Sequence, residues 1–186
     1  MVKGLNGFNY GTNDLLVPAV FRIRFLRRMG FKMKINDILQ EKGATVITIG
    51  ADQTIHAAIV ELNQHGFGAL VVTGSDGQVA GIVTERDILK CCGETCSKKL
   101  PQEHSPCQVL IQDIMTKDLV IGVPDDDLNY VMNVMTKHHI RHLPILDDGA
   151  LAGIISISDL VNAHLEENVF ESRTLKGYIH EWGRSH

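Results

Sequence analysis

Aromatic residues, long apolar runs and catalytic motifs are all scarce in this sequence of 186 residues. With only 5% aromatic residues, the core has to be built from Val, Ile, Leu, Ala and Met. No uninterrupted apolar run reaches the roughly 18 residues that a membrane-spanning helix needs, which predicts a soluble protein. There is no Gly-x-x-x-x-Gly-Lys phosphate loop, no Ser-His-Asp order and no legible acid–base pair, so we do not expect an enzyme.

The composition that is present supports a folded core. The chain is 44% hydrophobic and 22% charged, which excludes a disordered chain and a collagen-like one. At about 150 residues per domain, the length predicts one compact unit or two small units packed closely together.

The net charge of −4 is divided unevenly along the chain. Residues 1–34 carry seven basic groups and one acid, whereas the remainder carries 11 basic and 21 acidic groups and stands at −10. Nucleic acids select basic surfaces, so we expect no nucleic-acid partner. Residues 1–33 are Arg-rich, as transit peptides are, but hold no serine and no apolar stretch of a secretory signal. We interpret them as an extension of a cytoplasmic protein, with organellar targeting or a membrane-surface role as the alternative.

The rest of the chain is an internal repeat. Residues 69–87 align with residues 142–159 once one turn residue is removed, and each copy holds an Asp-Gly pair, a strong hairpin signal. Apolar residues at helical spacing precede each hairpin. Each repeat is expected to contain, in order, a helical turn, a strand, a helix, two hairpin strands and a final helix. In the first repeat these elements span residues 35–39, 45–49, 55–62, 69–73, 79–83 and from 84 onward. In the second repeat they span residues 111–115, 119–123, 128–135, 143–146, 151–155 and from 156 onward. We therefore predict an α+β fold of two β-α-β-β-α repeats, packed with pseudo-twofold symmetry.

Several motifs resemble those of one family. Gly81-Ile-Val-Thr-Glu-Arg-Asp87 and Gly153-Ile-Ile-Ser-Ile-Ser-Asp159 resemble the signature that ends each half of a tandem CBS-domain module. Residues 140–145 resemble that family's sequence before the central strand, and the likeness to the stand-alone bacterial and organellar type runs from Lys34 to Val161. It implies a non-catalytic regulatory binder of adenosine-containing ligands (AMP, ADP, ATP, S-adenosylmethionine or NAD(H)) with no required cofactor. The implied division is an extension (1–33), CBS domain 1 (34–92), a linker (93–108), CBS domain 2 (109–164) and a helical tail (165–186).

The end of each repeat has chemistry that suits a nucleotide. A helix N-terminus favours phosphate, and Thr84 or Ser156 adds a hydroxyl there. Asp87 or Asp159, three residues later, can accept both hydroxyls of a ribose. The same Ser/Thr-x-x-Asp pattern is also a helix capping box, and the two roles can coexist. We expect nucleotide binding and rank the Ser156/Asp159 site first.

Further candidate ligand residues surround these motifs. Arg141 and His142 precede the central strand of the second repeat and can donate to phosphate, unless they are solvated strand-edge residues. Arg86 stands where the second repeat has Ser158, and it can reach a phosphate from the helix. The expected wall for the base comprises Thr48, Ile49, Ile121 and Val123, and the family resemblance adds Pro144.

Metal or redox chemistry is the alternative function. Possible zinc ligands lie in or beside the linker: Cys92, Cys96, His104 and Cys107. They lack the paired C-x₂-C spacing of a zinc site, so reduced thiols are favoured, with a Cys91/Cys96 or Cys92/Cys96 switch left open. The acidic residues 125–127 suit a helix dipole, or Mg²⁺ bound through nucleotide phosphates. An NAD(H)-using enzyme is a further alternative.

The C-terminal part predicts a helix with apolar stripes. One stripe contains Leu165, Val169 and Phe170, and a second contains Leu175, Tyr178, Ile179 and Trp182. Such stripes dock on the protein itself or on a second subunit. We expect a homodimer that signals ligand occupancy to a protein target.

Overall fold

The computed structural model describes residues 32–43, 46–97 and 106–167. The described elements are α2 (Ile35–Lys42), β1 (Thr48–Gly50), α3 (Ile55–His65), β2 (Ala69–Thr73), β3 (Val79–Thr84), α4 (Glu85–Ser97), the 3₁₀ turn η1 (Pro106–Gln108), α5 (Ile111–Ile114), α6 (Leu128–Lys137), β4 (His142–Asp147), β5 (Ala150–Ser156) and a helix over residues 157–167. This mixture of helices and strands confirms the predicted α+β class. None of the described helices is long and apolar enough to cross a membrane.

The strands form two sheets with the same hairpin design. In the first sheet β1 pairs in parallel with β2, and β2 pairs antiparallel with β3; in the second sheet β4 and β5 are antiparallel. The pairing register shifts after Val72 in one hairpin and after Ile145 in the other, at equivalent positions of the repeat. Gly77 and Gly149 turn the hairpins with positive φ, a conformation that glycine adopts without steric cost.

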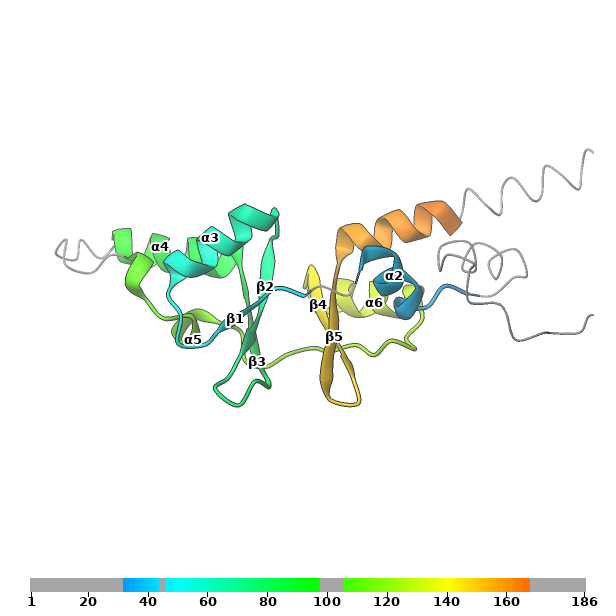
Figure 1. Cartoon of the computed structure of the whole chain (residues 1–186). Coiled ribbons are helices and arrows are strands. Elements are labelled where there is room, and N and C mark those ends of the chain that lie inside the picture. Colours follow the sequence, from blue (N-terminus) through cyan, green and yellow to red (C-terminus); the bar gives the residue numbers. More distant parts are fainter. Residues whose placement is uncertain (1–31, 44–45, 98–105, 168–186) are drawn as a thin grey trace, which may run out of the picture.

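The two sheets lie side by side in the middle of the molecule, and the helices cover their outer faces (Figure 1). Each sheet has its own apolar core. The first core includes Ile55, Leu70, Val83 and Ile111, and the second includes Ile35, Leu128, Leu143 and Ile155. All eight of these residues are no more than 2% exposed. Aliphatic side chains dominate both cores, as the aromatic-poor composition predicts.

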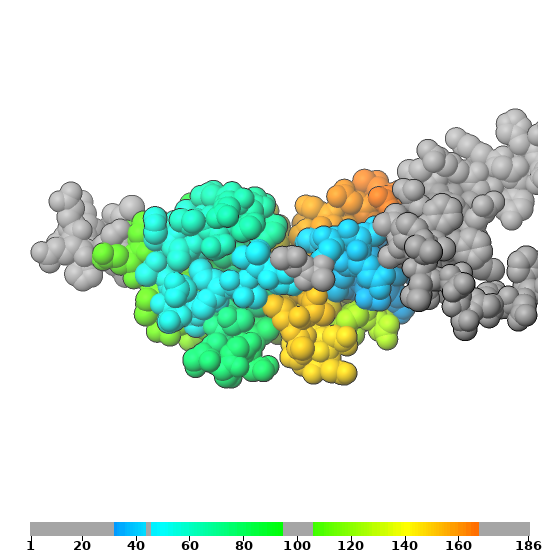
Figure 2. Space-filling model, in the orientation of Figure 1, coloured from blue at the N-terminus to red at the C-terminus, as the bar shows by residue number. Residues whose placement is uncertain are grey.

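The opening helix of each repeat packs on the other half of the molecule. Ile35 of α2 is fully buried in the second core, and its N–H donates to the Asp126 carbonyl over 3.0 Å. In return, Ile111 of α5 is fully buried in the first core and donates to the Gln53 carbonyl over 2.8 Å. Figure 2 shows blue α2 against the yellow strands of the second half. The folded halves therefore differ from the sequence repeats: each borrows its opening helix from the other.

Some predicted elements differ from the observed ones. The strand expected over residues 119–123 is wrong, because only Gly122 pairs, in a single bridge to Ile145. The next N–H, of Val123, donates to the Asp126 carboxylate over 2.9 Å, and Pro124 has no N–H to offer. In addition, α2 continues to Lys42 beyond the expected helical turn. The helical tail is described only to residue 167, and its remaining stripe residues lie outside the described part.

Candidate functional site

A cavity of about 410 Å³ lies between the two halves. Much of its lining comes in pairs of equivalent residues from the two repeats: Gly68 with Arg141, Thr84 with Ser156, Glu85 with Ile157, and Arg86 with Ser158. The remaining lining residues are Ile82, Asp87, Thr116, His139, Ile140 and His142. Backbone bonds repeat the pairing, since Glu85 N–H donates to the Gly68 carbonyl over 3.2 Å and Ile157 N–H to the Arg141 carbonyl over 2.9 Å. The cavity therefore lies where equivalent segments of the two repeats face each other.

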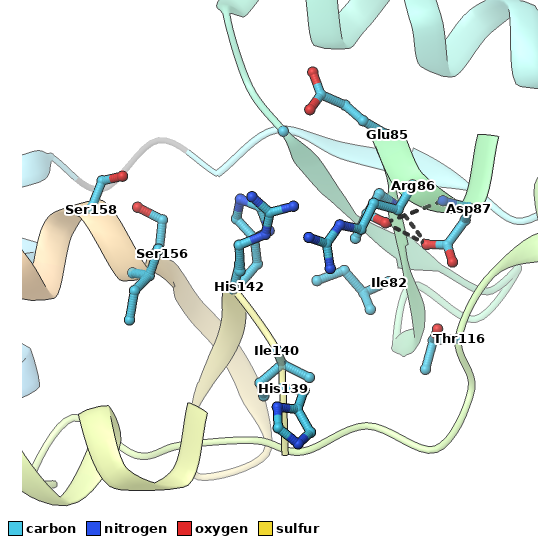
Figure 3. A pocket seen from close by; sticks show the side chains of 14 residues that line it. Ile82, Glu85, Arg86, Asp87, Thr116, His139, Ile140, His142, Ser156 and Ser158 are labelled. Carbon is cyan, nitrogen blue, oxygen red and sulfur yellow. Dashed lines mark hydrogen bonds between the residues drawn. The ribbon is translucent and has the colours of Figure 1, made fainter. Parts of the chain in front are cut away.

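Thr84 and Asp87 form a reciprocal cap where β3 runs into α4. The Thr84 N–H and hydroxyl donate to Oδ2 of Asp87 over 2.9 and 2.7 Å, and the Asp87 N–H donates back to the hydroxyl over 3.4 Å. Figure 3 shows these bonds on the first-half side of the cavity. The hydrogen bonds that the described residues make to this carboxylate all use Oδ2, and Asp87 itself lines the cavity.

Ser156 and Asp159 repeat this cap, with one added partner. The Ser156 N–H and hydroxyl donate to Oδ2 of Asp159 over 2.7 and 2.8 Å, and Asp159 N–H donates back over 3.2 Å. Lys42 Nζ also donates to this Oδ2 over 2.8 Å. Burial on its own would raise the pKa of Asp159, but the hydrogen bonds from Lys42 and Ser156 outweigh it and lower the pKa. Ser156 lines the cavity and Asp159 does not.

Cationic groups from both halves meet in the cavity. Arg86 comes from the first turn of α4 and Arg141 from the residue before β4, and no described residue forms an ion pair with either guanidinium. In Figure 3 Arg86 extends away from α4 toward the side where His142 lies. Burial lowers the pKa of His142, and the positive charges of Arg141 and Lys42 lower it further. The imidazole is therefore neutral near pH 7, and the two arginines make the site attractive to an anion.

Comparison with known proteins places this architecture in a family. A family model described as the CBS domain matches residues 37–94 and again residues 111–166. The chain belongs to the CBS-domain family. It is 32% identical over 183 residues to the mitochondrial CBS domain-containing protein CBSX3 of Arabidopsis thaliana, covering 90% of this chain and 85% of that protein.

Solved structures support the same assignment. A CBS-domain protein from Agrobacterium tumefaciens is 38% identical, with a TM-score of 0.65 over 73% of this chain and 96% of that chain. Another CBS domain pair, 23% identical with a TM-score of 0.63, covers 74% of this chain and 99% of its own, and was crystallised with 5′-methylthioadenosine and S-adenosylmethionine. At that identity the second likeness concerns the fold of the CBS pair alone.

The CBS pair brings six of the sequence-predicted ligand residues into the one cavity and leaves six outside it. The six inside are Thr84, Arg86, Asp87, Arg141, His142 and Ser156. Of the others, Thr48 is exposed on β1, Ile121 is 49% exposed and Pro144 is buried within β4, while Asp159 binds Lys42. Ile49 is buried in the first core and Val123 is 45% exposed, so neither lines the cavity. The residues expected as the wall for the base therefore do not line this cavity.

The apolar wall comes instead from residues that the sequence did not single out. Ile82, Ile140 and Ile157 line the cavity, together with Thr116 from the segment after α5. Ile82 and Ile157 flank the two Ser/Thr positions, a local signal that was available from the motifs. Thr116 had no such signal, because it reaches the site only when its backbone pairs with Ile82.

The metal candidates are not brought together in the described ranges, where no three His, Cys, Asp or Glu side chains form a possible metal site. Cys92 is half-buried and Cys107 is exposed. The Cys96 side chain and His104 lie outside the described part, so the four-ligand zinc hypothesis stays untested. In the acidic run, Lys34 binds Asp127 over 3.1 Å and Asp126 accepts the Val123 N–H, which gives both carboxylates structural partners.

Proposed function

We propose that this CBS pair binds an adenosine nucleotide, AMP in the first place, in the cavity between its halves. It would act as a regulatory sensor without catalysing a reaction. The observation that carries the proposal is the meeting of Arg86 and Arg141, from opposite halves, in a cavity that also holds the helix-start carboxylate of Asp87. The volume of about 410 Å³ is within the usual range for small-molecule sites. The adenosine ligands of the crystallised CBS neighbour support the same ligand class.

Each part of a nucleotide has a matching group in this cavity. The two guanidinium groups and the N-terminus of α4 suit the phosphate, since arginine binds phosphate with paired donors. The carboxylate of Asp87, which lines the cavity, can accept the ribose hydroxyls. Ile82, Ile140 and Ile157 offer the base an apolar surface. The proposal therefore places the ribose at Asp87, not at Asp159, which the sequence ranks first.

Binding would also connect ligand occupancy to the arrangement of the halves. Because the phosphate donors come from different halves, a bound nucleotide favours the arrangement in which both reach it. That preference is what a regulated protein target could detect. ADP, ATP, NAD(H) and S-adenosylmethionine are the competing ligands, and the homodimer, the protein target, any Mg²⁺ and the cytoplasmic location remain predictions.

Isothermal titration of the full chain with AMP, ADP, ATP, NADH and S-adenosylmethionine tests the proposal. Wild type should bind AMP, and Asp87→Asn or Arg141→Gln should weaken binding by about tenfold or more, the cost of one charge-assisted hydrogen bond. Asp113→Asn is the matched control, because Asp113 is an exposed acid in the first turn of α5 and outside the cavity. A wild-type chain that binds none of these ligands would overturn the proposal.

A further inference from the structure

The two helix-start aspartates of the CBS pair are chemically inequivalent. Both accept the N–H and the hydroxyl of the residue three positions earlier on Oδ2. Asp159 alone of the two also receives an ammonium group, from Lys42, whose Nζ lies 2.8 Å from the same oxygen. Among the described residues no cation forms an ion pair with Asp87, although Arg86 precedes it in the chain.

The position of Lys42 is fixed by packing. It is the last residue of α2, which is anchored in the second core by the buried Ile35 and Ile38. From there Nζ donates to the Ile154 carbonyl over 3.0 Å as well as to Asp159. The side chain thus joins the end of β5 to the following helix, with its own side chain 36% exposed and that of Asp159 22% exposed. A partly buried contact with two hydrogen bonds is better held than an ordinary surface ion pair.

The difference between the halves comes from the lengths of the exchanged helices. α2 has eight residues and carries Lys42 in its last turn, whereas α5 has four and ends at Ile114. After α5 the chain instead runs along β3, where Thr116 and Ile82 exchange two backbone hydrogen bonds of 2.9 and 3.0 Å. The extra turn of α2 is what brings a lysine to one aspartate and not to the other.

We propose that Lys42 is a built-in plug on the Asp159 carboxylate: it occupies the group that a ribose would otherwise use, so that this CBS pair holds one nucleoside per chain, at Asp87. A ribose hydroxyl at Asp159 would have to compete with the Lys42 ammonium, which brings to the carboxylate a full positive charge that a hydroxyl lacks. It would also leave the Lys42 ammonium without its carboxylate. This inference rests on the proposed function, because it concerns how many adenosine ligands bind and where.

Equilibrium dialysis with radiolabelled AMP on the full chain tests the plug. Wild type should bind one AMP per chain, Asp159→Asn should bind it with an affinity within about twofold of wild type, and Asp87→Asn should lose about tenfold or more. Lys42→Ala should raise the number of AMP molecules bound per chain above one, because it frees the Asp159 carboxylate for a second ribose. Lys137→Ala is the matched control, a lysine in the last turn of α6, and it should leave the stoichiometry at one.

The outcomes separate the two proposals. Two AMP per wild-type chain, a tenfold loss in Asp159→Asn, or a Lys42→Ala chain that still binds only one AMP would each overturn the plug while leaving the proposed function intact. No AMP binding by wild type would overturn both. Circular dichroism and thermal melting of each variant show whether a loss of binding is a loss of folding.

Discussion

His142 is a residue at which groups from both repeats act on one side chain. Its ring lies so close to Gly68 of the other half that a Cβ built on Gly68 would stand 3.2 Å from His142 Cε1. Burial is the main cause of its lowered pKa, followed by the charges of Arg141 and Lys42; the carboxylates of Asp159 and Glu85 oppose them. A proton on this imidazole is therefore unfavourable in the folded protein.

This shift predicts a loss of stability on acidification. The unfolded chain protonates His142 near pH 6.5 and the folded chain only at lower pH, so the unfolded state binds more protons between the two values. The free energy of unfolding should thus fall as the pH drops below about 6.5, and His142→Gln should remove part of that fall. Urea midpoints measured from about pH 7.5 to about pH 5 test this, with His56→Gln on the exposed face of α3 as control.

A His142→Gln chain that keeps the full acid-induced loss would contradict this assignment. The lowered pKa of Asp159 does not affect this pH range. The ionised carboxylate stabilises the folded state above pH 3.8, the pKa of the unfolded chain. That stabilisation is lost only as the pH falls through the still lower pKa of the folded protein.

At the scale of elements, two equivalent glycines let the exchanged helices approach the sheets. A Cβ on Gly81 of β3 would lie 2.8 Å from both the Met115 sulfur and the Thr116 carbonyl oxygen. A Cβ on Gly153 of β5 would instead meet the end of the Leu39 side chain. The glycine of each Gly-Ile-Val/Ile motif is therefore required by close packing of the borrowed helix segment, in addition to any role near the ligand.

We expect Gly81→Ala to lower the free energy of unfolding by about 1–3 kcal/mol, because the backbone of Thr116 cannot move aside easily. Gly153→Ala should cost less, since Leu39 can change rotamer, and its cost should shrink further when it is measured in a Leu39→Ala background. Urea unfolding measures both. As a control, Gly93→Ala in α4 has nothing within 4 Å of the new Cβ and should be neutral or stabilising. Equal losses at Gly81 and Gly153 would contradict this account.

The sequence predicts elements where the signal is local. Helical periodicity and the two Asp-Gly pairs predict α3, α6 and both hairpins, and the short motif around Thr84 and Asp87 places a strand end beside a helix start. The Lys42–Asp159 bond joins residues 117 positions apart, so no local pattern announces it. The apolar wall was missed for a similar reason: which strand faces meet the cavity depends on how the two sheets pack together.

At the scale of the whole molecule, the exchanged helices make the halves mutually dependent. Ile35 and Ile111 are both fully buried, each in the core of the half to which its repeat does not belong. Truncating one such isoleucine typically costs about 2–5 kcal/mol, and losing the whole helix removes more. The sequence alignment of the two repeats cannot reveal this exchange. The repeats would align equally well if each opening helix packed on its own half.

A cut between the repeats should therefore leave the molecule assembled. A protease site inserted within residues 98–105 and cleaved under native conditions should give two fragments that elute together in size-exclusion chromatography. The fragments should separate only in denaturant, because α2 of one fragment packs in the second core and α5 of the other packs in the first core. Each fragment expressed alone should lack cooperative unfolding. Fragments that separate after native cleavage would show that the exchange contributes little.

Both ends of the described chain leave the molecule from the same place. Lys32 and Glu167 border one small pocket beside Leu128, at the start of α6 in the second half. Arg86 and Asp87 belong to the other half, so both borders of the described chain lie away from these two site residues. A tag joined directly beside Lys32 or Glu167 would therefore begin next to α6, on the second half.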